Sequence, residues 1–493
     1  MNTEKGYAAG FRTLDTEVSD RKLPVEGTLP TWLRGSLLRN GPARFEAGSG
    51  AAGRAFRHWL DGQAMLHRFA FADGRVTYTN RFVDTPSSRA ARESGRIAYP
   101  EFATDPCRSL FARFFSAFSR PEVSNTNVSV ARFGERFVAL TETPLPVEFD
   151  PETLATAGVV GYEDALKGQL TTAHPHQDPG TGDLVNQLTH FARRSEYRVH
   201  RQPPTGTKRE LIGRHPVTRP GYMHSFAITG RYVVLAEFPL TVNPLSLILS
   251  GRPFIENYRW DPERGTRFIV FDQREGGVRG VYETTACFAF HHINAWEDEG
   301  RDGDLVLDLC AYSDASVIDA LYLDRLRAGG GVPVSYPTRF RIGLRTGRVE
   351  TKRLAGESME LPRIAYERHN GRDYRYAYGV SSHDGREDDF INQLVKVDTR
   401  TGATLTWHEE GCYPGEPVFV PAPDAADEDD GVLLSLVLDS VNGSSSLLVL
   451  SARTLDVLAR AQAPHIVPYG FHGLFTGQTP YERLRQKAQN PLS

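Results

Sequence analysis

The sequence predicts an all-β protein, and the arrangement of its strands favours a β-propeller. Alternating apolar and polar residues dominate the middle and C-terminal parts of the 493-residue chain. A period of two residues is typical of strands with one buried face. Turn dipeptides separate these runs at short intervals, as expected for antiparallel strands that follow one another directly.

Four segments share one pattern: an alternating run, an arginine, a tight turn and a second alternating run. They are residues 267–284, 339–354, 393–408 and 447–462, with the turn arginines Arg274, Arg345, Arg400 and Arg453. These arginines are 71, 55 and 53 residues apart. A four-stranded blade takes about 40–50 residues, so the chain has room for about seven blades with loops. A β-sandwich is the alternative, because such hairpins also occur there.

Further turn dipeptides extend the all-β prediction over the rest of the chain. They are Asp61-Gly62, Asp73-Gly74, Asp384-Gly385 and Asp430-Gly431. No low-complexity segment that could serve as a linker separates one part of the sequence from another. The sequence therefore predicts a single propeller domain over residues 1–493.

The composition excludes several classes of protein. Hydrophobic residues make up 40% of the chain and charged residues 24%, which is typical of a folded globular protein. The formal net charge is −4 and there is no basic run, so no nucleic-acid partner is expected. The four cysteines form no CxxC pair, and the first thirty residues carry charges where a signal peptide would be apolar. Both features favour a reducing, cytoplasmic location.

Two apolar segments interrupt the strand pattern. In residues 105–120 an aspartate and a proline can begin a helix. One face of that helix would carry Leu110, Phe111, Phe114, Phe115 and Phe118. Residues 238–251 contain no charged residue and are too short to span a bilayer. One interpretation is packing on the sheet core; the other is a membrane patch in a cap or mouth that dips into one leaflet.

Four of the fifteen histidines stand out from their surroundings. His174, His224, His291 and His472 lie beside aromatic or small residues, at apparent beginnings of strands and with few charges nearby. A buried imidazole needs partners for both ring nitrogens, which backbone or carboxylate groups can supply. The separations of 50, 67 and 181 residues match no local zinc motif. In a propeller, however, strands from different blades converge on one axis, so ligation of a metal is an alternative.

Three glutamates lie in apolar or proline-containing sequence, where an unpaired charge would be costly. They are Glu142, Glu360 and Glu416. A salt bridge to an arginine is the simplest role for each. The alternative is that each accepts the N–H of a metal-bound imidazole and so fixes its orientation.

Several motifs together resemble those of the carotenoid cleavage oxygenases, a family that includes β-carotene 15,15′-oxygenases, apocarotenoid oxygenases and retinoid isomerohydrolases. These motifs are LRGSLLRNGPARFE, HWLDGQAMLHRFAF, LTETPLP, TAHPH, MHSFAIT, FHHINAWED, YPGEPVFVP with its EDDG turn, and FHGLF. They span nearly the whole chain, and together they are specific although each alone is weak. The resemblance implies a seven-bladed propeller with a helical and loop cap over its central axis.

The resemblance also implies a metal site. It places the four ligands of one Fe(II) per chain at His174, His224, His291 and His472. It places three glutamates behind them, pairing Glu142 with His224, Glu360 with His291 and Glu416 with His472, and it leaves His174 without a glutamate.

Two further features have narrower support. Phe290 and Phe471 each directly precede a ligand histidine and are candidates for lining a substrate tunnel, although strand packing would also explain them. The segment around Cys107 looks like a membrane-associated segment of the animal retinoid and β-carotene enzymes.

The function implied by the resemblance is that of a non-haem Fe(II) dioxygenase. It would cleave one C=C bond of a carotenoid or apocarotenoid with O2 and give two carbonyl products. The animal-type segment favours central 15,15′ cleavage, which yields retinal. Because such substrates reside in bilayers, we expect the protein to associate peripherally, as a monotopic protein, with a membrane surface.

Three alternatives stay open at this point. A retinoid isomerohydrolase or a stilbene-cleaving oxygenase would use the same scaffold and ligands. A metal-free propeller that binds other proteins is the non-enzymatic alternative, and in that case the seven residues need not converge.

Overall fold

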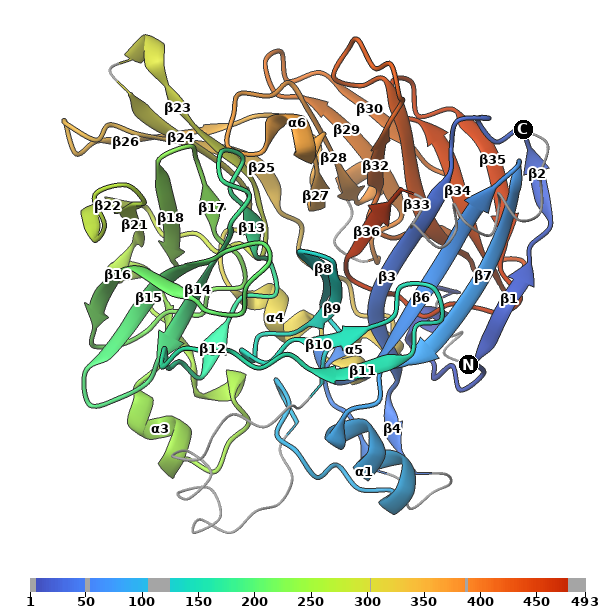
Figure 1. Cartoon of the computed structure of the whole chain (residues 1–493), viewed down its shortest axis with the longest axis horizontal. Helices are drawn as coiled ribbons and strands as arrows, with labels where there is room; N and C mark the ends of the chain where they lie inside the picture. The colour runs from blue at the N-terminus through green and yellow to red at the C-terminus, as the bar shows by residue number, and fades with distance from the viewer. Residues whose placement is uncertain (1–5, 49–53, 105–124, 302, 386–388, 478–493) are drawn as a thin grey trace.

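Short antiparallel strands with one buried face form the body of the protein. The structure is a computed structural model, and it describes residues 6–48, 54–104, 125–301, 303–385 and 389–477. Within these ranges, seven sheets contain four or more strands each. Figure 1 shows them arranged around a common centre, each as one blade of a seven-bladed propeller. The predicted fold class is confirmed.

The first three blades come mainly from the N-terminal half of the chain. Blade 1 contains β1 (Val18–Lys22), β3 (Gly35–Arg44), β6 (Gln63–Ala72), β7 (Arg75–Phe82) and β36 (Gly473–Thr476). Blade 2 contains β8 (Ser129–Phe133), β9 (Arg136–Leu140), β10 (Val147–Phe149) and β11 (Thr156–Val159). Blade 3 contains β12 (Leu170–Thr171), β13 (His176–Gln177), β14 (Leu184–His190), β15 (Ser195–Gln202) and β16 (Glu210–Val217).

The other four blades follow in chain order. Blade 4 contains β17 (Ala227–Ile228), β18 (Tyr232–Glu237), β21 (Thr266–Asp272) and β22 (Val278–Thr284). Blade 5 contains β23 (His292–Asp298), β24 (Asp304–Ala311), β25 (Tyr336–Ile342) and β26 (Val349–Arg353). Blade 6 contains β27 (Glu360–Arg363), β28 (Tyr376–Ser381), β29 (Gln393–Asp398) and β30 (Thr404–Trp407). Blade 7 contains β31 (Cys412–Pro414), β32 (Val418–Pro421), β33 (Gly431–Asp439), β34 (Ser444–Ser451), β35 (Val457–Gln462) and β2 (Val25–Gly27).

Small elements fill the space between and beside the blades. Two further strand pairs are β4 (Glu46–Ala47) with β5 (Arg54–Ala55), and β19 (Leu240–Thr241) with β20 (Arg259–Trp260). The α-helices of the described residues are α1 (Pro86–Ser94), α3 (Pro244–Leu249), α4 (Ser316–Ala320), α5 (Leu323–Arg327) and α6 (Tyr366–His369). The 3₁₀ turns are Gly6–Phe11, Trp59–Asp61, Ile255–Asn257, Pro262–Arg264, Glu299–Arg301 and His383–Gly385.

The two ends of the sequence exchange strands to close the ring. The C-terminal strand β36 pairs with β3 in blade 1, from Ser36 opposite Thr476 to Arg39 opposite Gly473. The N-terminal strand β2 completes the outer edge of blade 7 by pairing with β35. In Figure 1 the blue N-terminal strands accordingly lie beside the red C-terminal strands. This exchange ties the first and last blades together by backbone hydrogen bonds.

Each of the four repeated segments forms the predicted hairpin, namely β21–β22, β25–β26, β29–β30 and β34–β35. Asp73 and Gly74 also form a tight hairpin turn, with φ of 50° and 68°. The hairpin predicted at Asp61-Gly62 is wrong. Asp61 is fully buried, and its carboxylate accepts hydrogen bonds from His58 N and Ala103 N at 3.0 and 2.9 Å.

The apolar segment 238–251 divides into two parts. Phe238 and Val242, which come before and after β19 in the chain, are buried. Helix α3 follows, and its Leu245 and Leu249 are 62% and 68% exposed. Only the second half of this segment therefore lies at the surface. The other apolar segment, residues 105–120 with the predicted helical face, lies outside the described residues.

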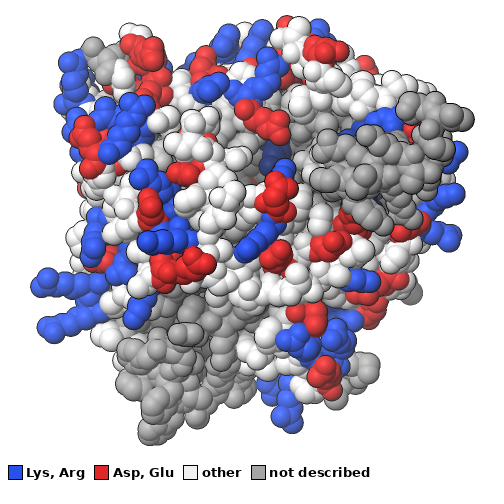
Figure 2. Space-filling model, viewed as in Figure 1, with Lys and Arg blue, Asp and Glu red and all other residues white. Residues whose placement is uncertain are grey.

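The surface carries charges of both signs. Figure 2 shows Lys and Arg side chains interspersed with Asp and Glu side chains over the face in view. Of the helices that the structure describes, none combines the length and the apolar character needed to cross a bilayer.

A buried ion pair in blade 5 is hydrogen-bonded to a tyrosine of blade 6. Asp308 of β24 is fully buried and accepts hydrogen bonds from Arg339 of β25 at 2.9 and 2.8 Å. It also accepts one at 2.7 Å from the hydroxyl of Tyr374, which precedes β28 of the next blade. We expect D308A to lower the free energy of unfolding by about 3–5 kcal/mol, because it leaves a guanidinium and a buried hydroxyl without their acceptor.

Urea denaturation checks this stability prediction. The control is E135A, which removes the acceptor of Arg132 in a pair whose side chains are 49% and 88% exposed. Exposed pairs contribute about 0–1 kcal/mol, so E135A should unfold close to the wild type. Equal free energies of unfolding for D308A and the wild type would contradict the assigned role of Asp308.

Candidate metal centre

Four histidines from four blades meet at the centre of the propeller. His174 lies between β12 and β13, whereas His224, His291 and His472 each lie just before an inner strand, β17, β23 and β36. His174 Nε2 is 3.0 Å from His224 Nε2, and His291 Nε2 is 3.1 Å from His472 Nε2. One ligand atom from each of the four side chains lies within 4.8 Å of the other three.

The backbone near these histidines is held by contacts between blades. The Ser225 hydroxyl donates to the carbonyl of Phe290 at 2.6 Å and accepts from the backbone N–H of His292 at 3.1 Å. Ser225 therefore joins the loops that carry His224 and His291. Near His472, a Cβ atom on Gly41 of β3 would lie 2.3 Å from the Cα of Gly470, so only glycine allows the segment before β36 to approach β3 this closely.

Three glutamates lie directly behind three of the histidines. The Nδ1 atom of His224 donates to Glu142 Oε1 at 2.8 Å, and that of His291 donates to Glu360 Oε2 at 2.5 Å. The Nδ1 atom of His472 donates to Glu416 Oε1 at 2.7 Å. Within the described residues His174 makes no hydrogen bond to a carboxylate. The glutamates come from blades 2, 6 and 7, so each of the seven blades contributes one residue to this double layer.

The arrangement fits a cation bound by imidazole. Because Nδ1 donates its hydrogen to a carboxylate, a neutral ring keeps a bare lone pair on Nε2. The lone pairs of His291 and His472 therefore face each other at 3.1 Å. Such a contact is repulsive unless a cation lies between the nitrogens. Four neutral nitrogen ligands suit iron, zinc or copper in the 2+ state.

Burial lowers the pKa of His174, His224 and His472 and so favours their neutral form, which is the form that binds a metal. It lowers the pKa of His472 to about 4, although Glu416 acts in the opposite direction. The pKa of His174 is also lowered by burial and by the three other histidines of the cluster. Burial raises the pKa of Glu360, but His291, the backbone N–H of Leu361 and His224 together outweigh it and the net shift is downward. Neutral rings at His174, His224 and His472 therefore lie together with a charged carboxylate at Glu360.

The second histidines of the two paired motifs have other partners. His176 Nδ1 contacts the Tyr366 hydroxyl at 2.8 Å and its Nε2 contacts the carbonyl of Phe226 at 2.9 Å. His292 Nδ1 contacts the Ser225 hydroxyl at 2.8 Å. These side chains stabilise the inner strands.

Phe290 and Phe471 are buried beside the histidines. The ring of Phe290 is 5.3 Å from that of His224, edge to face, and the ring of Phe471 is 4.6 Å from that of Trp59. Both rings give the centre an apolar border. A substrate-lining role for them stays a prediction.

Sequence patterns alone did not identify Tyr222. Its hydroxyl donates to Glu142 Oε1 at 2.6 Å, the same oxygen that accepts from His224. Tyr222 is two residues before His224, so alternation along the chain could have suggested that both side chains lie on the same side.

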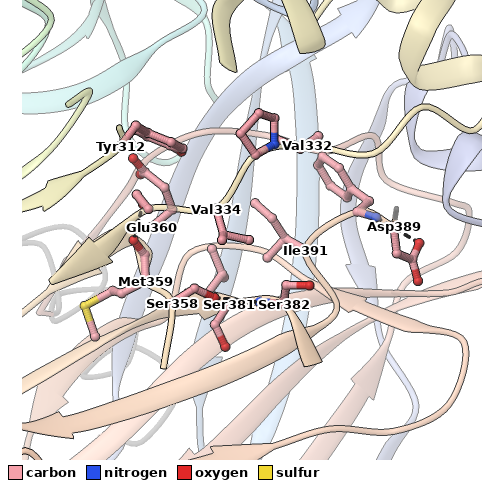
Figure 3. Close-up of a pocket in the computed structure, with 14 residues that line it drawn as sticks. Tyr312, Val332, Val334, Ser358, Met359, Glu360, Ser381, Ser382, Asp389 and Ile391 are labelled. Atoms are coloured by element: carbon pink, nitrogen blue, oxygen red, sulfur yellow. Dashed lines mark hydrogen bonds between the residues drawn. The ribbon is translucent and has the colours of Figure 1, made fainter. Parts of the chain in front are cut away.

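A pocket lies behind Glu360 (Figure 3). Figure 3 shows Glu360 and Tyr312 on one side of the pocket and Asp389 on the opposite side, with Val334 and Ile391 between them. Glu360 Oε1 has no hydrogen-bond partner in the described part of the chain. The pocket thus gives this oxygen room for a water molecule.

Comparison of the sequence with known proteins identifies the family of this chain. The family model described as "RPE65: Retinal pigment epithelial membrane protein" matches residues 11–477. The chain belongs to this family, the carotenoid cleavage oxygenases. It is 38% identical to the carotenoid isomerooxygenase of Galleria mellonella, over 94% of this chain and 95% of that protein. It is 34% identical to a mitochondrial carotenoid-cleaving dioxygenase of Macaca fascicularis, over 92% of this chain and 91% of that protein.

Solved structures of carotenoid cleavage oxygenases share the fold. An ACO/RPE65 chimera is 28% identical, with a TM-score of 0.84 over 96% of this chain and 98% of that chain. Cobalt-substituted Synechocystis ACO is 27% identical, with a TM-score of 0.84 and the same two coverages. A four-histidine cluster is typical of the iron site of this family.

Proposed function

We propose that the protein is a non-haem Fe(II) dioxygenase that cleaves one C=C bond of a carotenoid or apocarotenoid with O2 into two carbonyl products. The observation that carries this proposal is the convergence of four imidazole Nε2 atoms within 4.8 Å, in a family of carotenoid cleavage oxygenases. Ferrous iron, when bound, supplies the activation of O2.

The histidines and the glutamates of the site have different roles. His174, His224, His291 and His472 hold the ion through neutral nitrogens, so that the ligands bring no charge to it. The carboxylates of Glu142, Glu360 and Glu416 accept the Nδ1 hydrogens and fix three of the rings in one tautomer and orientation.

The surroundings suit a hydrocarbon. Phe288, Phe290 and Phe471 are buried near the centre and belong to one hydrophobic cluster. A polyene placed there leaves water, which favours binding by the hydrophobic effect. We assign Phe290 and Phe471 to the lining of the substrate tunnel. Within the family we place this chain among the enzymes of central 15,15′ cleavage, with retinal as product.

Metal and product analysis test the proposed function. We expect about one iron per chain after anaerobic purification, and loss of activity after removal of iron by a chelator. With β-carotene we expect uptake of O2 and the formation of retinal, identified by mass. Unequal aldehydes would place the cleaved bond elsewhere, whereas retinol formed from retinyl ester without O2 would indicate an isomerohydrolase. Reproducible absence of bound metal would contradict the proposal.

Helix α3 is the described surface that we assign to membrane contact. Leu245 and Leu249 are exposed on it, and the helix contains no charged residue. Apolar side chains of this kind can enter the boundary between head groups and acyl chains. We expect L245S/L249S to reduce the fraction of protein that sediments with phosphatidylcholine liposomes several-fold. The control is V441S, at a residue that is 73% exposed in the turn between β33 and β34. Unchanged sedimentation of folded L245S/L249S would exclude α3 as the contact.

A further inference from the structure

The three carboxylates behind the histidines differ in what surrounds them. Glu416 is 1% exposed and lies between two arginines. Its Oε1 accepts from Arg363 Nε at 2.9 Å as well as from His472 Nδ1. Its Oε2 lies 3.9 Å from Arg39 Nη1 and accepts from the backbone N–H of Gly473 at 2.8 Å.

The other two carboxylates have neutral partners. Glu142 accepts from the Tyr222 hydroxyl in addition to His224. Glu360 accepts from the backbone N–H of Leu361 at 2.6 Å in addition to His291. Neither of them makes an ion pair with an arginine or lysine in the described part of the chain. Positive charge is therefore concentrated behind His472.

The arginines change the total charge of the centre. Four neutral imidazoles, three carboxylates and an ion of charge 2+ together carry one net negative charge. With the guanidinium groups of Arg39 and Arg363 the same centre carries one net positive charge. Charges in a buried site are poorly screened, so each one strongly affects the relative stability of the ferric and ferrous states of the ion.

We propose that Arg363, together with Arg39, acts through Glu416 to raise the reduction potential of the bound iron and so favours the ferrous state. Both are positioning residues, since they touch the carboxylate and not the metal site itself. This inference rests on the proposed iron centre. Glu416 draws the Nδ1 hydrogen of His472 toward itself and so makes the Nε2 lone pair a stronger ligand, which favours ferric iron. The two guanidinium groups attract the carboxylate charge and so weaken this effect.

Arg363 is the better of the two for an experiment. Arg363 holds one backbone carbonyl, because its Nη2 donates to that of Gly473. Arg39 holds two, because its Nη1 donates to the carbonyl of Glu416 at 3.0 Å and its Nη2 donates to that of Phe471 at 3.2 Å. The side chain of Arg39 is 3% exposed, whereas that of Arg363 is 27% exposed. Arg363 lies on the inner strand β27 and can be replaced with less disturbance of the core.

The experiment compares R363Q, R363K and R274Q in the full-length protein loaded with iron. R363Q removes the charge but keeps a hydrogen-bond donor, and R363K keeps the charge. R274Q makes the same change of charge at an exposed residue in the turn between β21 and β22 of blade 4. The reduction potential of the ferric–ferrous couple is measured by spectroelectrochemistry under anaerobic conditions. Cobalt(II) absorption spectra of the same variants report the ligand geometry without a change of oxidation state.

We expect R363Q to shift the ferric–ferrous equilibrium about tenfold toward ferric iron, which is about 59 mV for one electron. R363K should lie near the wild type, R274Q should not differ from it, and the cobalt spectra should coincide. An unchanged potential in R363Q, or an equal decrease in R363K and R363Q, would overturn the inference. So would an altered cobalt spectrum in R363Q, because geometry would then explain the shift. Failure of the wild type to bind iron would instead contradict the proposed function.

Discussion

Replacement of His291 by alanine is expected to abolish both iron binding and carotenoid cleavage. Three Nε2 atoms then remain for the ion, and Glu360 loses the imidazole that donates to it at 2.5 Å. The loss should exceed the 10–100-fold effects typical of residues behind the ligands. Iron per chain, measured by elemental analysis, and turnover of β-carotene, measured as O2 consumed, check this prediction.

The matched control is H292A, at the next residue of the chain, where β23 begins. His292 contacts the Ser225 hydroxyl at 2.8 Å and lies outside the four-histidine cluster. H292A should therefore keep most of its iron, with some loss of stability where the inner strands of blades 4 and 5 meet. If H292A lost iron while H291A retained it, the ligand in the FHHIN motif would be the other histidine.

The fold was predictable wherever strands are long and turns are short. The segments 267–284 and 447–462 form the expected hairpins, since each carries alternation on both sides of one turn. The inner strands were not predictable in this way. β13 and β17 have two residues each, too few for any periodicity, and their position depends on contacts with neighbouring blades. Asp61-Gly62 resembles a turn between strands, but the Asp61 carboxylate instead serves buried backbone N–H groups.

The candidate site was predictable from residue type and family motif, and its supporting contacts were not. His291 and Glu360 are 69 residues apart, so that only the ring of blades places Nδ1 and Oε2 at 2.5 Å. Ser225 and Arg363 are ordinary polar residues in sequence. Their importance comes from the partners that the fold brings to them from other blades, the carbonyl of Phe290 and the carboxylate of Glu416.

Replacement of Glu416 by glutamine is expected to lower both stability and activity. Glu416 accepts from His472, Arg363 and the backbone of Gly473, and it is almost completely buried. Glutamine offers one acceptor oxygen and turns an N–H group toward these donors. It also leaves two guanidinium groups without a counter-charge, which costs about 3–5 kcal/mol of unfolding free energy. Urea denaturation and iron content measure the two effects separately.

E360Q removes the same charge with a different expected outcome, and the comparison separates folding from ligation. The hydrogen bonds from His291 and Leu361 to Glu360 both go to Oε2, so a glutamine oxygen can still accept them. Its amide nitrogen would take the place of Oε1, which faces the pocket and has no partner in the described part of the chain. E360Q should therefore unfold within about 1 kcal/mol of the wild type and still lose about 10–100-fold in iron affinity or turnover. The two variants differ in that only E416Q leaves Arg363 and Arg39 without a counter-charge. Equal destabilisation of E360Q and E416Q would therefore mean that the two arginines contribute nothing to the difference between the carboxylates.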